Sequence, residues 1–224
     1  MRRAVVGLVA GLTVAGGAPA AWAVARPPSS AGVPVTQVLA APAGDVLLRP
    51  VMAPQPPADV LPPVTVRDAA PVAVPDPAPA PVALSVPGSG VAAAVDPVGV
   101  TGSGLMELPP DVGRVGWYRF GPAPGQPGSA VLAGHVDDAE QGLGPLAALR
   151  SVEPGQPVEV TDAAGGISRW RVVSRELVEK QALPLAALFA RSGEPRLVLL
   201  TCGGPFRPEL GSYRDNVVVV AVPA

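Results

Sequence analysis

The chain contains one cysteine and one histidine, and each stands directly after an apolar run. Cys202 follows LVLLT (residues 197–201), and His135 follows AVLAG (residues 130–134). A free thiol is only about 3% ionised at neutral pH, so a cysteine nucleophile needs a neighbouring base such as imidazole. The same imidazole can later protonate a leaving amine. The two residues therefore suggest catalysis by a cysteine–histidine pair.

Both residues also have an ordinary explanation, which the sequence leaves open. Most free cysteines are small buried hydrophobic residues, and a histidine can simply close a strand. Two observations favour chemistry. The sole thiol and the sole imidazole both lie where an apolar strand stops, and an exported chain rarely keeps a lone thiol that has no task.

Arg214 is the third candidate, because it precedes a valine-rich run at residues 216–222. If that run pairs antiparallel with the run before Cys202, the guanidinium lies beside the thiol. It could then hold a substrate carbonyl oxygen as this becomes an oxyanion. The alternative is the commoner fate of an arginine, a surface ion pair, here with Asp215 or Glu209.

Other kinds of site are excluded by composition. One cysteine allows neither an intrachain disulfide nor an all-cysteine metal site, and no carboxylates flank His135 or Cys202 at ligand spacing. We expect no metal and no cofactor. The formal net charge is -2 with no basic stretch, so we expect no nucleic-acid partner.

The N-terminus predicts export. Two arginines precede an uncharged apolar run at residues 4–25, which gives an N-in, C-out orientation. About 20 residues cross a bilayer, whereas the core of a signal peptide has about 7–15, so residues 1–25 favour an uncleaved signal-anchor. Small-residue triplets at 21–23 and 23–25 keep a cleaved signal peptide as the alternative. The rest of the chain then lies on the cell-wall side of the membrane, or is secreted.

A proline-rich segment follows at residues 26–81. Of the chain's 31 prolines, 16 lie between residues 26 and 87. Proline removes backbone donors and fixes φ, so we expect a disordered, extended linker with no core. About 60 such residues reach at most about 190 Å, which predicts a spacer between the membrane and the folded domain.

Residues 82–224 predict one all-β domain with one or two short helices. The expected strands are residues 83–86, 90–95, 105–108, 129–135, 157–161, 168–176, 196–201 and 216–222. The expected helices are residues 145–150 and 183–191. Short strands with few helices favour a closed barrel or a sandwich.

Three motifs resemble the sortases, a family of cysteine transpeptidases. VLAGH (residues 131–135) resembles the strand that ends in their catalytic histidine, and LLTC (residues 199–202) resembles their Thr-Leu-x-Thr-Cys motif. Arg214, which opens a valine-rich strand, matches their essential arginine.

The resemblance covers about residues 81–223 and has local features. GWY (residues 116–118) and PGQPG (residues 124–128) are similar to the actinobacterial branch called class E or F. Val198 departs from the motif, which usually has threonine there, and we expect this position to face the barrel interior. The loop GGPF (residues 203–206) is unusual and leaves substrate preference open.

The resemblance implies a closed eight-stranded β-barrel and transpeptidation by a monomer. Secreted proteins with a C-terminal sorting signal similar to Leu-Pro-x-Thr-Gly would be cut after the Thr, and Cys202 would form a thioacyl link to it. An amine of a peptidoglycan precursor, or of a pilin, would resolve the link. Residues 183–191 would receive the Leu-Pro of the signal.

Two other functions remain open from the sequence. One is an enzyme of the same fold that mainly hydrolyses its substrate. The other is a non-catalytic, wall-associated β-module, in which Cys202 is buried far from His135.

Overall fold

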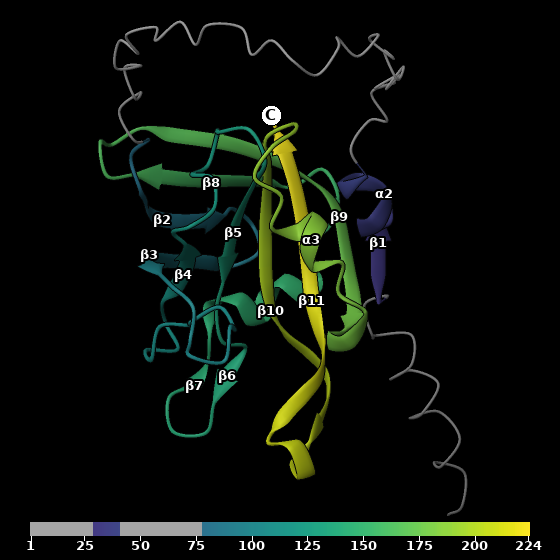
Figure 1. Ribbon diagram of the computed structural model, residues 1–224. Coiled ribbons are helices and arrows are strands. Elements are labelled where there is room, and N and C mark those ends of the chain that lie inside the picture. The colour runs from purple at the N-terminus through teal and green to yellow at the C-terminus, as the bar shows by residue number, and fades with distance from the viewer. Residues whose placement is uncertain (1–28, 41–77) are drawn as a thin grey trace, which may run out of the picture.

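The computed structural model describes residues 29–40 and 78–224, which form one β-rich body (Figure 1). The strands are β1 (Ser30–Gly32), β2 (Pro81–Val86), β3 (Val91–Val98), β4 (Val115–Tyr118), β5 (Ser129–Ala133), β6 (Asp137–Asp138), β7 (Gly142–Leu143), β8 (Pro157–Asp162), β9 (Ile167–Glu179), β10 (Arg196–Arg207) and β11 (Ser212–Pro223). The helices are α2 (Val35–Leu39), η1 (Pro145–Ser151), η2 (Lys180–Ala182), α3 (Leu185–Leu188) and η3 (Pro208–Leu210). The expected signal-anchor lies outside the described residues, within which no helix is long and apolar enough to span a membrane.

Eight strands close into a barrel, as the sequence predicted. Their order is β9-β11-β10-β5-β4-β3-β2-β8, and β8 pairs back onto β9. Closure is possible because β9 is long: Ile167–Arg171 pair with β8, while its later residues pair with β11. The barrel therefore has no free edge between β8 and β9.

The strands bury two different faces. The interior cluster draws side chains from all eight barrel strands, with Trp170 and Leu199 among the most buried. A second cluster lies outside the barrel, on the neighbouring strands β5, β10 and β11, where α2 and α3 cover it. Strand side chains alternate between faces, so neighbours of Leu199 belong to the outer cluster. The expectation that Val198 faces the interior is therefore wrong: it packs in this outer cluster.

All predicted strands but one are present, and one predicted helix is shorter than expected. Residues 105–108 form no strand and make only an isolated bridge between Val100 and Met106. In their place β4 completes the barrel, pairing with β3 and β5. The expected helix at residues 183–191 shortens to α3, which begins directly after Pro184.

Part of the predicted linker is folded, which corrects the expectation for residues 26–81. Residues 29–40, the N-terminal strap, add β1 to the later part of β9 and place α2 over the outer cluster (Figure 1). Val35 and Leu39 are 1% and 4% exposed. The Val35 N–H donates a hydrogen bond to Glu176 Oε2 at 3.0 Å. Apolar burial and strand pairing thus fix this segment, while residues 41–77 lie outside the described part.

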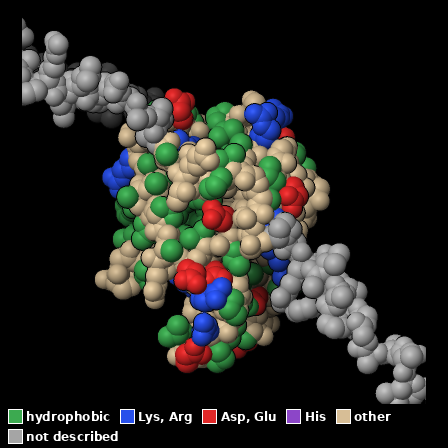
Figure 2. Space-filling view, turned by 90° about the vertical axis from the view of Figure 1, so that its right-hand side faces the viewer, with side chains coloured by type: hydrophobic (Ala, Val, Ile, Leu, Met, Phe, Trp, Pro, Cys, Tyr) green, Lys and Arg blue, Asp and Glu red, His purple; other side chains and the backbone are tan. Residues whose placement is uncertain are grey.

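The β10–β11 hairpin extends beyond the barrel, beneath the other elements in Figure 1. Viewed from the side that carries the strap, charged side chains of both signs gather on the lowest lobe, where this hairpin lies (Figure 2). Arg207 and Glu209 form an ion pair there at 3.5 Å. The hairpin base carries two of the predicted site residues.

Candidate active site

The buried parts of two neighbouring strands end side by side, and His135 and Cys202 follow them. β5 itself ends at Ala133, whereas β10 continues past Cys202 to Arg207, so the expectation that the strand stops before the cysteine is wrong. β5 and β10 run parallel, with Leu200 opposite Ala133. Beyond this pair the Gly134 N–H donates to the Leu200 carbonyl at 3.1 Å, and Thr201 Oγ1 donates to the Gly134 carbonyl at 2.9 Å. The chain therefore delivers the histidine and the cysteine to the same end of the sheet.

Both residues continue the same face of the sheet. Ala133 and Leu200 belong to the outer cluster, and side chains alternate along a strand. His135 and Cys202, two residues further along, therefore follow on the outer face where their strands leave the cluster. Each is partly exposed, so neither is a sealed core residue.

Arg214 reaches the same region from β11. β10 and β11 are antiparallel neighbours, as predicted, with Cys202 opposite Asn216 and Gly203 opposite Asp215. Arg214 lies two residues before Asn216, near the start of β11, and is exposed. Its backbone thus lies diagonally across from the thiol-bearing residue.

The Arg214 guanidinium is held by carboxylates in this structure. Nε and Nη2 donate to Asp215 at 2.7 and 2.9 Å, and Glu179 lies 3.8 Å from Nε. These contacts raise the pKa of Arg214, chiefly through the hydrogen bonds to Asp215. The ion pair with Asp215, foreseen as the alternative, is therefore present, whereas Glu209 pairs with Arg207. Among the described residues, Nη1 of Arg214 has no hydrogen-bond partner.

Asp215 is buried beneath the residues that follow the cysteine. Residues 203–206, expected as a loop, instead continue β10 with an irregularity in its pairing to β11. The side chain of Asp215 is 2% exposed. Gly204, which has a φ of +72°, lies against this carboxylate, and a Cβ on Gly204 would overlap Asp215 Oδ2. A glycine is thus required at position 204 for two reasons: its backbone is left-handed, and a side chain would overlap the Arg214–Asp215 pair.

The loop after His135 is tightly held. Asp138 accepts hydrogen bonds from the N–H groups of Glu140 and Gln141, both at 2.9 Å, which keep the pKa of Asp138 below its ordinary value. Gly144 has no space for a side chain, since a Cβ would lie 2.5 Å from the His135 carbonyl oxygen. These contacts fix the backbone that presents the imidazole.

A hydrogen bond joins this loop to β11. Tyr213, the residue before Arg214, donates its hydroxyl proton to Asp137 Oδ2 at 2.5 Å. The pKa of Tyr213 is raised, first by this hydrogen bond, then by burial and by the charges of Asp137 and Cys202. The phenol therefore stays neutral and closes a bridge from the histidine loop to the arginine strand.

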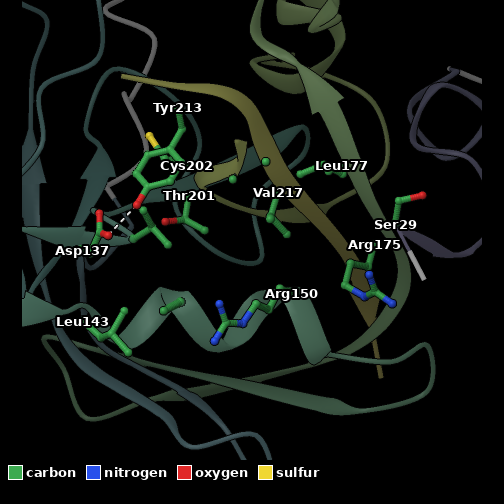
Figure 3. A pocket seen from close by; sticks show the side chains of 14 residues that line it. Ser29, Asp137, Leu143, Arg150, Arg175, Leu177, Thr201, Cys202, Tyr213 and Val217 are labelled. Atoms are coloured by element: carbon green, nitrogen blue, oxygen red, sulfur yellow. Dashed lines mark hydrogen bonds between the residues drawn. The ribbon is translucent and has the colours of Figure 1, made fainter. Parts of the chain in front are cut away.

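A cavity of about 230 Å³ opens beside this bridge (Figure 3). Cys202, Tyr213 and Asp137 lie at one end and Arg175 at the other, while Arg150 projects from η1 between them. Its walls come from η1 and from the ends of β9, β10 and β11. Cys202 thus borders a hollow lined by both acidic and basic groups.

Comparison with known proteins decides the family. The Sortase domain matches residues 84–224, a span that includes all three predicted site residues. The chain belongs to the sortase family. Sortases are cell-surface enzymes that act on sorting signals and amine acceptors, so the match supports a sortase-type transpeptidase in general. No curated protein sequence matches the chain.

Solved structures similar to this sortase are sortases as well. Sortase A from Listeria monocytogenes is 19% identical, with a TM-score of 0.48, over 66% of this chain and 88% of that chain. Sortase A from Corynebacterium diphtheriae, in a lid mutant, is 18% identical, with a TM-score of 0.48, over 63% and 68%. Sortase C2 of Pilus Island 1 from Group B Streptococcus is 20% identical, with a TM-score of 0.48, over 63% and 72%.

The structure adds residues to the site that the sequence analysis did not name as functional. Asp137 and Tyr213 each lie within two residues of a predicted site residue, and this closeness was the only available signal. Asp215 was foreseen only as a surface partner of Arg214, whereas it is buried. Arg150 and Arg175 are distant in sequence from every motif, so only the fold of this sortase brings them to the cavity.

Proposed function

We propose that this sortase is a cysteine transpeptidase that cuts a Leu-Pro-x-Thr-Gly-like sorting signal after its Thr and transfers the protein to a cell-wall amine. The observation that carries the proposal is the parallel register of β5 and β10. It brings together the ends of two buried stretches, which are followed by the chain's sole histidine and sole cysteine. A shared site needs this arrangement, whereas a buried structural thiol does not.

The proposed chemistry assigns one task to each residue. The Cys202 thiolate attacks the Thr carbonyl carbon, and the C–N bond to Gly breaks as His135 protonates the leaving amine. Nη1 of Arg214, which has no partner among the described residues, donates to the oxyanion. An incoming neutral amine then attacks the thioester, a C–N bond forms, and the C–S electron pair returns to sulfur. The proton lost by the amine passes to His135.

The sorting signal approaches over the outer cluster in this proposal. α3 lies within the region expected to receive the Leu-Pro, and Leu188 of α3 packs with Leu200, two residues before Cys202. The partly exposed Leu183 packs against the same cluster. An apolar Leu-Pro dipeptide fits such a surface.

The strap changes the expected position of the domain. If residues 4–25 anchor the chain, only about 17 Å of extended chain separates Ala25 from Ser30, which is already paired with Glu176. The barrel then lies at the membrane surface. A long spacer between the membrane and the barrel does not fit this arrangement, and we propose a membrane-attached, extracytoplasmic, monomeric enzyme.

The proposal is tested with a sorting-signal peptide and an added amine. Intact enzyme should release the Gly-containing fragment and form a product that contains the amine, and Cys202→Ala should form neither. Full turnover by the Cys202→Ala protein would end this proposal. Free Thr acid with no amine product would favour the alternative, a peptidase of the same fold that mainly hydrolyses.

The third function, a non-catalytic wall-associated module, requires an inaccessible thiol. Cys202 is partly exposed and lines a cavity, which favours a working thiol. A methanethiosulfonate reagent should therefore label it. Assignment to the class E or F branch stays a prediction.

A further inference from the structure

The cavity beside Cys202 lies on the opposite face of β10 and β11 from the proposed route of the sorting signal. Its wall includes Thr201 and Val217, which alternate with the outer-cluster residues Leu200 and Val218. Val217 belongs to the interior cluster. Cys202 borders this cavity as well as the outer face, so a second substrate held in the cavity lies next to the thioester while the sorting signal occupies the other face.

The two ends of the cavity carry opposite charge. Asp137 lies beside Cys202, where its carboxylate accepts the Tyr213 hydroxyl. Arg150 projects from η1 between the Asp137 and Arg175 ends of the cavity (Figure 3), and among the described residues it has no hydrogen bond or ion pair. The apolar side chains of Leu177 and Val217 line the side of the cavity across from η1.

Arg175 is the second arginine of the cavity, but its guanidinium is already bound within the protein. It is 2% exposed, and its guanidinium is fixed by a 2.7 Å hydrogen bond from Nε to the Val152 carbonyl and a 3.2 Å contact with Glu153. The Arg175 charge is thus largely balanced by Glu153. Arg150, exposed and uncompensated within the described part of the chain, is the group able to bind an additional anion.

We propose that this cavity binds the acceptor, and that the acceptor is an amine whose own chain carries a free carboxylate. This inference rests on the proposed transpeptidase function. The amine lies at the end lined by Asp137 and Cys202, and the carboxylate pairs with Arg150. The cavity is smaller than the roughly 300–1,000 Å³ typical of drug-sized ligands, so it suits the end group of a larger acceptor.

The test compares acceptors that differ only in the charge of their carboxyl end. Glycine, diglycine and triglycine are each paired with their C-terminal amides, and the ratio of transfer to hydrolysis is measured with a fixed sorting-signal peptide. We expect intact enzyme to favour at least one acid over its amide by about fivefold, the range of an exposed ion pair. Arg150→Gln should remove this preference. Arg171→Gln, the same change at an exposed arginine of β9 that does not line the cavity, should keep it.

The outcomes separate this inference from the function on which it rests. Hydroxylamine, a small neutral nucleophile, should trap the thioacyl enzyme equally in intact, Arg150→Gln and Arg171→Gln proteins. If hydroxylamine gives product while every acid and amide pair is used alike, the acceptor inference is wrong and the transpeptidase stands. The inference also fails if Arg150→Gln keeps the preference. No hydroxylamine product from intact enzyme would instead overturn the proposed function, and the inference with it.

Discussion

Arg214 and Asp215, neighbours in the chain, form a two-point ion pair at the base of the β10–β11 hairpin, with donor–acceptor distances of 2.7 and 2.9 Å. The arginine side chain is 43% exposed, whereas the aspartate side chain is 2% exposed. The guanidinium therefore serves the fold as well as the proposed chemistry, because it balances a carboxylate that water does not reach.

Replacing Arg214 alone should therefore change both activity and stability. Arg214→Ala should lower transfer activity by about 100-fold, the usual cost of losing one oxyanion donor. It should also lower the melting temperature, because Asp215 stays buried without its partner. The double variant Arg214→Ala, Asp215→Asn removes the charge and should recover the melting temperature but not the activity. Recovery of activity in the double variant would exclude Arg214 as the oxyanion donor.

Gly204 should tolerate no side chain. Gly204→Ala places a methyl group against Asp215 and forces alanine into a φ of +72°. We expect a loss of about 1–3 kcal/mol in the free energy of unfolding, together with lower activity. Gly211→Ala is the matched control, since Gly211 has a φ of +56° but open space at its Cβ position. Equal effects of the two changes on stability and activity would show that contact with Asp215 is unimportant.

The Tyr213–Asp137 bridge should be visible in a pH titration. Asp137 raises the pKa of Tyr213, so Asp137→Asn should lower it. A raised pKa means that the neutral phenol contributes stability fully below about pH 10, the unfolded value, and loses this contribution as the pH rises through the folded value. Tyrosinate absorbance in a Tyr118→Phe background isolates Tyr213, because the chain has two tyrosines. Unchanged titration in Asp137→Asn would contradict the bridge.

The N-terminal strap should stabilise the barrel. Leu39 is 4% exposed within the outer cluster, so Leu39→Ala should cost about 2–4 kcal/mol in the free energy of unfolding. Val33, in the same strap, is 43% exposed, and Val33→Ala should cost less than about 0.5 kcal/mol. Chemical denaturation measures both. If the two losses are equal, the strap does not pack as described.

The sequence was sufficient for the parts of the fold that depend on long apolar runs. Val217–Val220 and Leu197–Leu200 are apolar runs of strand length, and both are buried strands in the structure, with the antiparallel pairing that the sequence analysis considered. β4 is different, since four residues containing a glycine give no clear alternation. The strap also escaped prediction, because Val35 and Leu39 stand among prolines and gain their burial from distant elements, namely β9, β11 and α3.

The candidate site was predictable only in part for a similar reason. The types and positions of Cys202 and His135 could be recognised, because each ends an apolar run. Contacts such as that between Tyr213 and Asp137 join residues 76 positions apart, so no local pattern reports them. The burial of Asp215 depends on the hairpin bending over it, which is a property of the folded chain.

The central claim is that Cys202 and His135 act on one acyl carbon. Mass spectrometry of the intact protein, incubated with a sorting-signal peptide and no added amine, tests it most directly. We expect a mass increase equal to the peptide acyl group, located on Cys202 after digestion and removed by hydroxylamine, with no adduct in Cys202→Ala and much slower formation in His135→Ala. An adduct that forms at the same rate without the histidine, or on another residue, would contradict this account.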